Sequence, residues 1–296
     1  MCIAVGDTGY VCRSTDGGET WTSQFLDTNF SFREVKMYDE KFGVMIGILS
    51  NRIFITQDGG LSWLQTTVPD SINKLYNSID LPNDSTIIIT CYRSKRYTII
   101  RSYNRGATWV EYDAFYKIND IKFINDQVGW ACGSAGYGTD RYFQYVEKTT
   151  NGGKSWTRIY QANMGDYGLS FIDFIDEKNG LAASKSANII STTDGGNTWV
   201  ADSFYDYENV KSGLMFTGIS FKSINKAFLS GFLDKVYISE GFLTNIIDKY
   251  FESESLSLSP NPTTDYITLT PEAAAEAKRI QIFSIEGIKM YDGEYS

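Results

Sequence analysis

The sequence predicts an all-β protein, a β-propeller built from four-stranded blades. A turn of the form Ser/Thr-x-Asp/Asn-x-Gly-x-Ser/Thr-Trp occurs five times, and its successive tryptophans are 42, 46, 47 and 43 residues apart. A fixed period of about 40–50 residues is the size of one propeller blade. Aromatic residues make up 15% of the chain, which is typical of packed sheet faces. About six such units are visible.

We call this motif the repeated turn, and each of its residue types has a structural task. The Asp or Asn side chain closes an Asx-type turn, and the Gly adopts a positive φ that a Cβ would resist. The Trp covers the seam beside the hairpin with a large apolar face. We therefore assign these residues to structure: Asp16, Gly18 and Trp21; Asp58, Gly60 and Trp63; Asn104, Gly106 and Trp109; Asn151, Gly153 and Trp156; Asp194, Gly196 and Trp199.

Short alternating runs bounded by Gly, Asn, Asp and Ser predict four strands in each of four complete units. They span 32–39, 42–48, 51–57 and 62–67; 75–80, 85–91, 97–103 and 108–113; 118–124, 128–133, 143–149 and 155–160; and 169–176, 180–184, 187–193 and 198–204.

The first and last units are shorter. The first shows only its last three strands, at 2–6, 10–14 and 20–24, so we expect the chain to begin within a domain. Its inner strand comes either from the C-terminal side or from an upstream segment. The sixth unit keeps strands at 216–223, 226–231 and 235–239, and its turn has degenerated to Ser239-Glu240-Gly241-Phe242. We place the propeller at 1–250, a linker at 251–255 and a second domain at 256–296.

The repeated turn resembles the Asp-box, or bacterial neuraminidase repeat. With the preceding Ile3-Ala4-Val5-Gly6 strand and the Asp7-Thr8-Gly9 turn, the first unit is most similar to propellers of the photosystem II assembly-factor type. Asp-boxes occur in hydrolases, receptors and assembly factors, so this resemblance implies the fold and leaves the function open.

The second domain opens with Pro260-Asn261-Pro262, followed by an alternating strand at 263–269 and a hairpin around Glu286-Gly287. This arrangement resembles the C-terminal sorting domain of proteins exported by the type IX secretion system. The resemblance implies a β-sandwich, truncated at Ser296, and the type IX machinery as a partner. It also implies a secreted or outer-membrane surface-attached protein whose signal peptide is missing from this chain.

Composition excludes several classes of function. The net charge of −9 and the lack of a basic run argue against a nucleic-acid partner, and no stretch is apolar enough to cross a membrane. Histidine is absent, which removes Ser-His and Cys-His catalysis and His-ligated zinc. We expect no metal and no cofactor. Cys2 and Cys12 flank a short hairpin, and both a disulfide and free thiols remain open.

Two groups of candidate binding residues follow from propeller geometry. Innermost strands line a central channel, and their polar middle positions are Lys36, Asp80, Lys122, Asp173 and Ser220, with Glu34 and Asp120 two residues before the lysines. Tyrosines in the loops opposite the repeated turns supply amphipathic contact area, as binding sites for proteins and sugars do. The main candidates among them are Tyr137, Tyr142, Tyr167 and Tyr205.

These features predict a non-catalytic propeller that binds a protein or a glycan on its channel-mouth face. A sialidase-like glycoside hydrolase is the alternative, although the Arg-Ile-Pro segment of that family is missing and no catalytic residue can be assigned. A factor for assembly or adhesion of a cell-surface complex is a third reading.

Overall fold

The computed structural model describes most of the first 240 residues and four short segments after them. The described ranges are 1–6, 9–26, 31–47, 52–68, 75–93, 96–114, 116–135, 143–163, 168–185, 188–203, 216–224, 226–231, 236–240, 256–258, 269–271, 278–283 and 289–295. Within these ranges the regular structure is entirely β-strand, and there is no helix that could span a membrane.

Four antiparallel sheets of four strands form the body of the protein, and each runs in sequence order. The second sheet holds β4 (Phe32–Met37), β5 (Gly43–Gly47), β6 (Arg52–Thr56) and β7 (Leu64–Thr67). The third holds β8 (Leu75–Asp80), β9 (Ile87–Arg93), β10 (Arg96–Ser102) and β11 (Val110–Ala114). The fourth holds β12 (Lys117–Phe123), β13 (Gly129–Ala135), β14 (Phe143–Thr149) and β15 (Thr157–Asn163). The fifth holds β16 (Leu169–Phe174), β17 (Gly180–Ser184), β18 (Asn188–Thr192) and β19 (Val200–Ser203).

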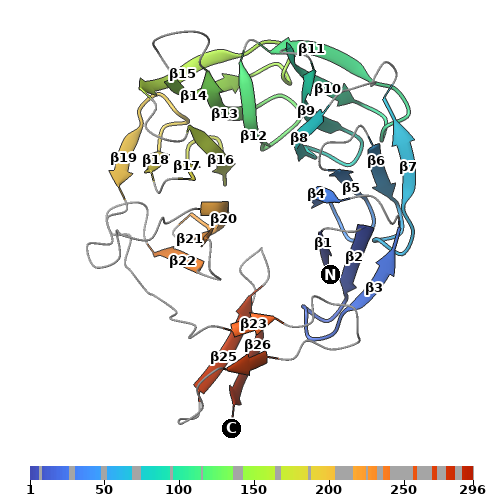
Figure 1. The fold of residues 1–296 in the computed structure, drawn as a ribbon. Coiled ribbons are helices and arrows are strands. Elements are labelled where there is room, and N and C mark those ends of the chain that lie inside the picture. Colours follow the sequence, from blue (N-terminus) through green and yellow to red (C-terminus); the bar gives the residue numbers. More distant parts are fainter. Residues whose placement is uncertain are drawn as a thin grey trace.

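Two three-stranded sheets flank these four, as the sequence predicts. The first sheet holds β1 (Cys2–Val5), β2 (Tyr10–Ser14) and β3 (Thr22–Phe25), and the sixth holds β20 (Phe216–Ser223), β21 (Lys226–Gly231) and β22 (Val236–Glu240). Figure 1 shows the six sheets arranged around a centre, with β4, β8, β12, β16 and β20 innermost. The prediction of propeller blades is confirmed.

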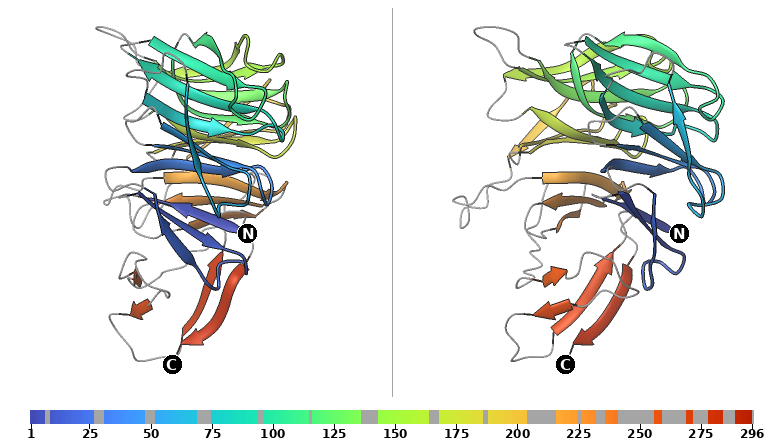
Figure 2. Two further views of the ribbon diagram at one scale, coloured as in Figure 1. Left: turned by 90° about the vertical axis from the view of Figure 1, so that its right-hand side faces the viewer. Right: turned by 45° about the vertical axis from the view of Figure 1, so that its right-hand side comes forward.

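The C-terminal segment contributes two further strand pairs. They join β23 (Leu256–Leu258) with β24 (Leu269–Pro271), and β25 (Lys278–Phe283) with β26 (Lys289–Tyr295). Figures 1 and 2 show β25 and β26 outside the ring of sheets. The hairpin predicted around Glu286-Gly287 agrees with the β25–β26 pairing, and its tip lies outside the described residues.

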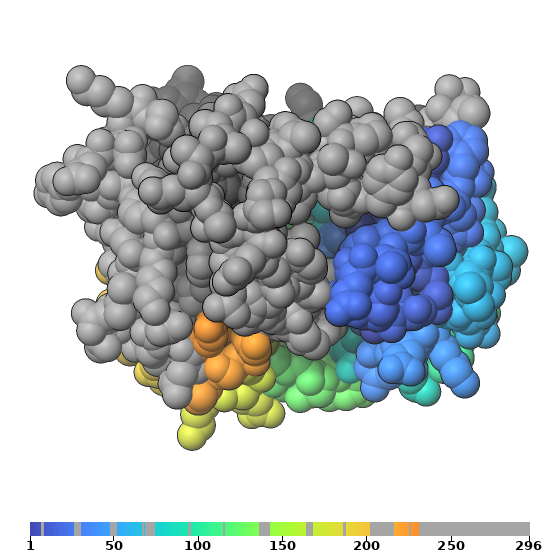
Figure 3. All heavy atoms as spheres, turned by 90° about the horizontal axis from the view of Figure 1, so that it is seen from below, coloured from blue at the N-terminus to red at the C-terminus, as the bar shows by residue number. Residues whose placement is uncertain are grey.

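The core consists of apolar layers between neighbouring sheets. One layer joins the second and third sheets through side chains such as Ile46, Ile53 and Ile87. Another joins the first and second sheets, where Ile3 packs with Phe32 and Met45, and the space-filling view in Figure 3 shows the dark blue first sheet against the lighter blue second. Because each sheet is apolar on both faces, every blade depends on its neighbours for burial.

The repeated turns share one hydrogen-bonded geometry, for which the second copy is representative. Thr56 Oγ1 donates to Asp58 Oδ1 at 2.8 Å and accepts from the Gly60 amide at 2.8 Å. The Asp58 carboxylate also accepts from the amide and the hydroxyl of Ser62, at 2.9 and 2.6 Å. The bonds from Ser62, followed by that from Thr56, lower the pKa of Asp58 to about 2. The Asp58 carboxylate that closes this turn is therefore ionised at neutral pH.

This geometry explains an error in the predicted strand boundaries. The outer strands were expected to start at the Ser or Thr beside the tryptophan, at 62, 108, 155 and 198. They start just after the tryptophan, at Leu64, Val110, Thr157 and Val200, because the Ser or Thr is held in the turn by the Asx side chain. As predicted, tryptophans of the repeated turns cover seams between sheets: Trp63, Trp109, Trp156 and Trp199 each pack on the layer shared with the preceding sheet.

A second turn, which the sequence analysis missed, supports the first. The hairpins after β4, β8, β12 and β16 open with Asp39, Asn83, Asn125 and Asp176, and the side-chain oxygen of each accepts two backbone amides. The backbone carbonyl two residues after each of these Asp or Asn residues accepts an amide from the repeated turn of the same blade. These bonds run from Gly59 to Lys41, Arg105 to Ser85, Gly152 to Gln127 and Gly195 to Lys178, at 2.8–2.9 Å.

Basic side chains connect the repeated turns of adjacent blades. Arg13 Nε donates to the Gly59 carbonyl at 2.6 Å, the buried Arg101 donates to that of Gly152, and Lys148 Nζ donates to that of Gly195 at 3.2 Å. Each of these residues immediately precedes the Ser or Thr of its own repeated turn. The seam thus carries a charge-assisted hydrogen bond beside its apolar layer.

All four cysteines are free thiols. The β1–β2 register places Cys2 opposite Ser14 and Cys12 opposite Ala4, so Cys2 and Cys12 are not partners. The structure therefore selects the free-thiol alternative.

We predict that Gly59→Ala destabilises the protein by about 2–4 kcal/mol, through positive-φ strain and overpacking. Gly59 has a φ of 74°, and a Cβ there would lie 2.4 Å from the Glu40 carbonyl oxygen. Gly17→Ala is the matched control, since its φ is 83° but no atom lies within 4 Å of the added Cβ. Gly17→Ala should therefore lower the free energy of unfolding by only about 1 kcal/mol, through the positive φ alone. Urea unfolding compares the two, and equal losses would contradict the packing argument.

Candidate functional site

The innermost strands enclose a polar channel of about 860 Å³. Its wall is formed by β4, β8, β12, β16 and β20, and Lys36, Lys122, Asp173 and Ser220 lie on it as the sequence predicts. Asp80 differs, because it is not among the residues that line the channel, although it is buried to the same degree as Asp173. Within the described residues there is no cluster of acidic and Cys side chains suited to a metal ion.

Each inner strand has a β-bulge at the equivalent position, near the mouth of the channel. The pairing register of each inner strand shifts at Arg33, Asn77, Asn119, Ser170 or Thr217, so these residues are unpaired within their own sheet. The first three reach the next blade: Arg33 Nη2 donates to Asn77 Oδ1 at 2.7 Å, Asn77 Nδ2 donates to the Ile118 carbonyl at 2.6 Å, and Asn119 Nδ2 donates to the Leu169 carbonyl at 2.7 Å. Bulges commonly re-aim side chains in this way.

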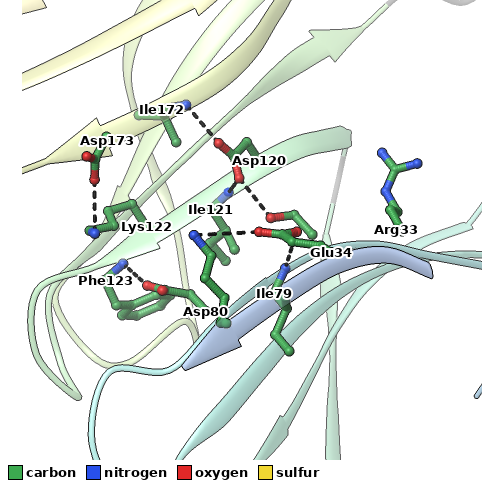
Figure 4. A network of polar contacts seen from close by, with 12 residues as sticks. Arg33, Glu34, Ile79, Asp80, Asp120, Ile121, Lys122, Phe123, Ile172 and Asp173 are labelled. Atoms are coloured by element: carbon green, nitrogen blue, oxygen red, sulfur yellow. Dashed lines mark hydrogen bonds and ion pairs between the residues drawn. The ribbon is translucent and has the colours of Figure 1, made fainter. Parts of the chain in front are cut away.

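Carboxylates link the inner strands below the mouth, and we call this set the carboxylate ladder. Glu34 accepts the Ile79 amide at 3.2 Å, Asp80 accepts that of Phe123 at 2.5 Å, Asp120 accepts that of Ile172 at 2.9 Å, and Asp173 accepts that of Phe221 at 2.8 Å. Figure 4 shows the first three of these bonds. Each acid thus satisfies an edge amide of the following blade, which is a structural task.

Two lysines balance the charge of the ladder. Lys36 Nζ lies 3.6 Å from Glu34 Oε1, and Lys122 Nζ lies 2.9 Å from Asp173 Oδ1 (Figure 4). Burial opposes the charge on both lysines, but Glu34 and other carboxylates raise the pKa of Lys36, and Asp173 and Asp80 raise that of Lys122. Both lysines therefore remain cationic in the channel.

Glu34 and Asp120 are the most perturbed acids of the channel. Burial raises the pKa of Glu34 to about 7, with Lys36 opposing and Asp120 adding to the rise. Burial also raises the pKa of Asp120, against Lys36 and the hydrogen bonds from Ile172 and Ser78. A carboxyl group that titrates near neutrality in a cavity is a candidate for function.

Three cations surround the mouth, and the sequence analysis missed them. Arg33, Lys117 and Lys185 are exposed, line the channel and come from three different blades. Burial, and then the charges of Arg33 and Lys185, lower the pKa of Lys117. We call these residues the basic rim. In the sequence these residues are distinguished only by their positions: Arg33 and Lys117 lie at the start of an inner strand, and Lys185 follows a second strand. These positions indicate a common site only when the strands are assembled into the ring.

The tyrosine candidates remain untested. Tyr137, Tyr142, Tyr167 and Tyr205 lie outside the described residues. Tyr160, a further tyrosine of this kind, packs on Trp199 with ring centroids 6.0 Å apart, so it belongs to a seam between blades.

Comparison with known proteins identifies the fold. No family model matches the chain, and no curated protein matches it. Among solved structures, YCF48 from Cyanidioschyzon merolae aligns with a TM-score of 0.58 at 19% identity, over 81% of this chain and 79% of that one. U3-55K aligns with a TM-score of 0.61 at 8% identity, over 80% and 73%. Virginiamycin B lyase from Staphylococcus aureus aligns with a TM-score of 0.54 at 12% identity, over 97% and 92%.

The chain is a β-propeller. The names of the aligned proteins describe different kinds of protein. At these identities the alignments show a common fold and no common function.

We predict that Glu34 makes the protein less stable as pH rises from 4.5 to 7. Its folded pKa of about 7 exceeds the ordinary 4.5, so the folded state binds more protons than the unfolded state in that window. The stability of wild type relative to Glu34→Gln should fall by about 2 kcal/mol across it. Urea unfolding at several pH values measures this. The exposed Glu19→Gln serves as control, and a pH-independent difference for Glu34→Gln would contradict the assignment.

Proposed function

We propose that this protein is a non-catalytic binding module that holds a partner protein at the mouth of its channel. The observation that carries the proposal is the basic rim. A chain with net charge −9 places three exposed cations around one polar cavity, so the rim is a local positive site on an acidic protein. Complementary charge of this kind guides association and selects partners. The partner surface is therefore acidic.

The ladder supports recognition over catalysis. Each channel acid is occupied by a backbone amide of the next blade, and two are also paired with lysines. Catalytic carboxylates need a free oxygen directed at a substrate. The resemblance of the repeated turns to Asp-boxes, and of the first unit to assembly-factor propellers, is consistent with a role in assembly or adhesion.

A charge-reversal experiment tests the proposal. The variant Arg33→Glu/Lys117→Glu/Lys185→Glu should lower the affinity for labelled acidic peptides at least tenfold and remove its salt dependence, as measured by fluorescence anisotropy. The control Lys41→Glu/Lys154→Glu/Lys178→Glu makes the same change in net charge at exposed positions in the turns of the opposite face. Equal affinities for the two variants would overturn the assignment of the rim.

We further propose that residues 256–296 are a type IX sorting domain and that the protein reaches the cell surface. The Pro260-Asn261-Pro262 sequence and the strand pairs β23–β24 and β25–β26 of the same segment support this. Expressed with a signal peptide in a type IX-competent bacterium, the full chain should be exported across the outer membrane. A version that lacks 256–296 should remain in the periplasm, and equal export of both would reject the assignment.

A glycoside hydrolase is the second candidate, and the raised pKa of Glu34 beside Asp120 favours it. Glycosidases use a pair of carboxyl groups, one of which has a raised pKa and acts as the general acid. Turnover of chromogenic glycosides that is abolished by Glu34→Gln or Asp120→Asn, with the fold intact, would establish this reading. Absence of turnover across the panel leaves recognition as the function.

A further inference from the structure

The bulge residues of the inner strands differ in length around the ring. In the third and fourth sheets the bulge residue is an Asn, whose side-chain amide reaches the next blade. Asn77 Nδ2 donates to the Ile118 carbonyl at 2.6 Å, and Asn119 Nδ2 donates to the Leu169 carbonyl at 2.7 Å. Both accepting residues immediately precede the bulge of their own strand. A carboxamide group thus joins two successive pairs of blades at the mouth.

The bulge residue of the fifth sheet is Ser170, whose side chain is too short for this contact. Its Oγ donates to the Gly168 carbonyl at 3.1 Å, within its own segment. In the sixth sheet the bulge residue Thr217 is also directed to its own sheet, since its Oγ1 donates to Ser230 Oγ at 2.9 Å. A hydroxyl has a single hydrogen to donate. Ser170 therefore makes no counterpart of the Asn bond.

The position that Asn occupies at the other junctions is open to the channel here. It is bounded by four residues of the channel lining, which we call the notch: Ser170, Lys185, Phe216 and Thr217. Deeper in the channel the two blades keep the usual contact, because Asp173 accepts the Phe221 amide at 2.8 Å. Figure 1 accordingly shows β16 and β20 as neighbours on the inner ring. The shorter side chain of Ser170 leaves room in the notch for a carboxamide group.

The notch also has the matching polar groups. The carbonyl that corresponds to those of Ile118 and Leu169 is that of Phe216, which precedes the bulge of β20. A backbone carbonyl has two lone pairs, so it can accept a side-chain amide in addition to its bond within the sheet. The Lys185 carbonyl accepts the Phe216 amide at 3.2 Å, and the Lys185 side chain is exposed. An acceptor for an amide therefore lies beside a cation of the basic rim.

We propose that the notch is a subsite for the side-chain carboxamide of an Asn or Gln on the partner protein, next to an acidic residue that pairs with Lys185. The partner's amide donates to the Phe216 carbonyl, as Asn77 and Asn119 donate to the equivalent carbonyls of their junctions. This subsite rests on the proposed function, because the basic rim attracts the acidic segment that carries the carboxamide. It adds selection by hydrogen bonding to selection by charge.

Two peptides and one filling variant test the proposal on the full chain. The probes are fluorescein-labelled Gly-Asp-Asn-Asp-Gly and Gly-Asp-Leu-Asp-Gly, which differ by the carboxamide and have the same charge. Wild type should bind the Asn peptide about fivefold more tightly by fluorescence anisotropy, because the Leu side chain forms no hydrogen bond. Ser170→Asn should bring the two affinities within about twofold, since its own carboxamide fills the notch. It should also raise the melting temperature by a few degrees, through the added bond between blades.

The control Ser23→Asn makes the same substitution at an exposed position of an outer strand and should keep the fivefold difference. Equal affinities of wild type for the two peptides would overturn the subsite. Destabilisation by Ser170→Asn would also overturn it, because the notch would then already be filled. The charge reversal of the basic rim separates this failure from that of the proposed function. It should weaken both peptides whether or not the subsite exists, and unchanged affinities for both would reject the rim and the subsite together.

Discussion

The carboxylate that accepts an amide from the next blade is the contact on which the channel wall depends. An inner strand presents one edge to its own sheet and the other to the channel, where its amides would otherwise need water. Asp80 and Asp173, both buried residues, accept such amides through their carboxylates. The acid on each blade thereby aligns the following inner strand, and the ring acquires a polar wall with fixed geometry.

That constraint also determines what the channel can do. Each acid of the ladder has an oxygen occupied by a backbone amide, and Lys36 and Lys122 offset the charge of Glu34 and Asp173. The positive groups that remain outside this network are at the mouth, on Arg33, Lys117 and Lys185. In the proposed function, recognition takes place at the rim, while the deeper carboxylates hold the blades together.

The opposite face is built by a different chemistry. There the Asx residue of each repeated turn forms its hydrogen bonds within the turn, and in three turns a basic side chain from the previous blade caps the carbonyl of Gly59, Gly152 or Gly195. Arg105 shows how tightly this geometry is held, since it is a non-glycine residue at a φ of 55° where the other turns have glycine. Its amide still donates to the Ser85 carbonyl, as the glycines do in the equivalent bonds. The hydrogen bonds of this face consequently stabilise the turns and join adjacent blades.

The sequence by itself determined the period, the all-β class, the five turns and the inner-strand positions of Lys36, Lys122 and Asp173, because these follow from local hydrogen bonding and alternation. Only the tertiary structure decided which side chains meet. Asp80 and Phe123 are 43 residues apart, and Arg33, Lys117 and Lys185 come from three blades. Such contacts depend on the bulges and on the angle between sheets, which packing of the whole ring sets. No local pattern encodes that angle.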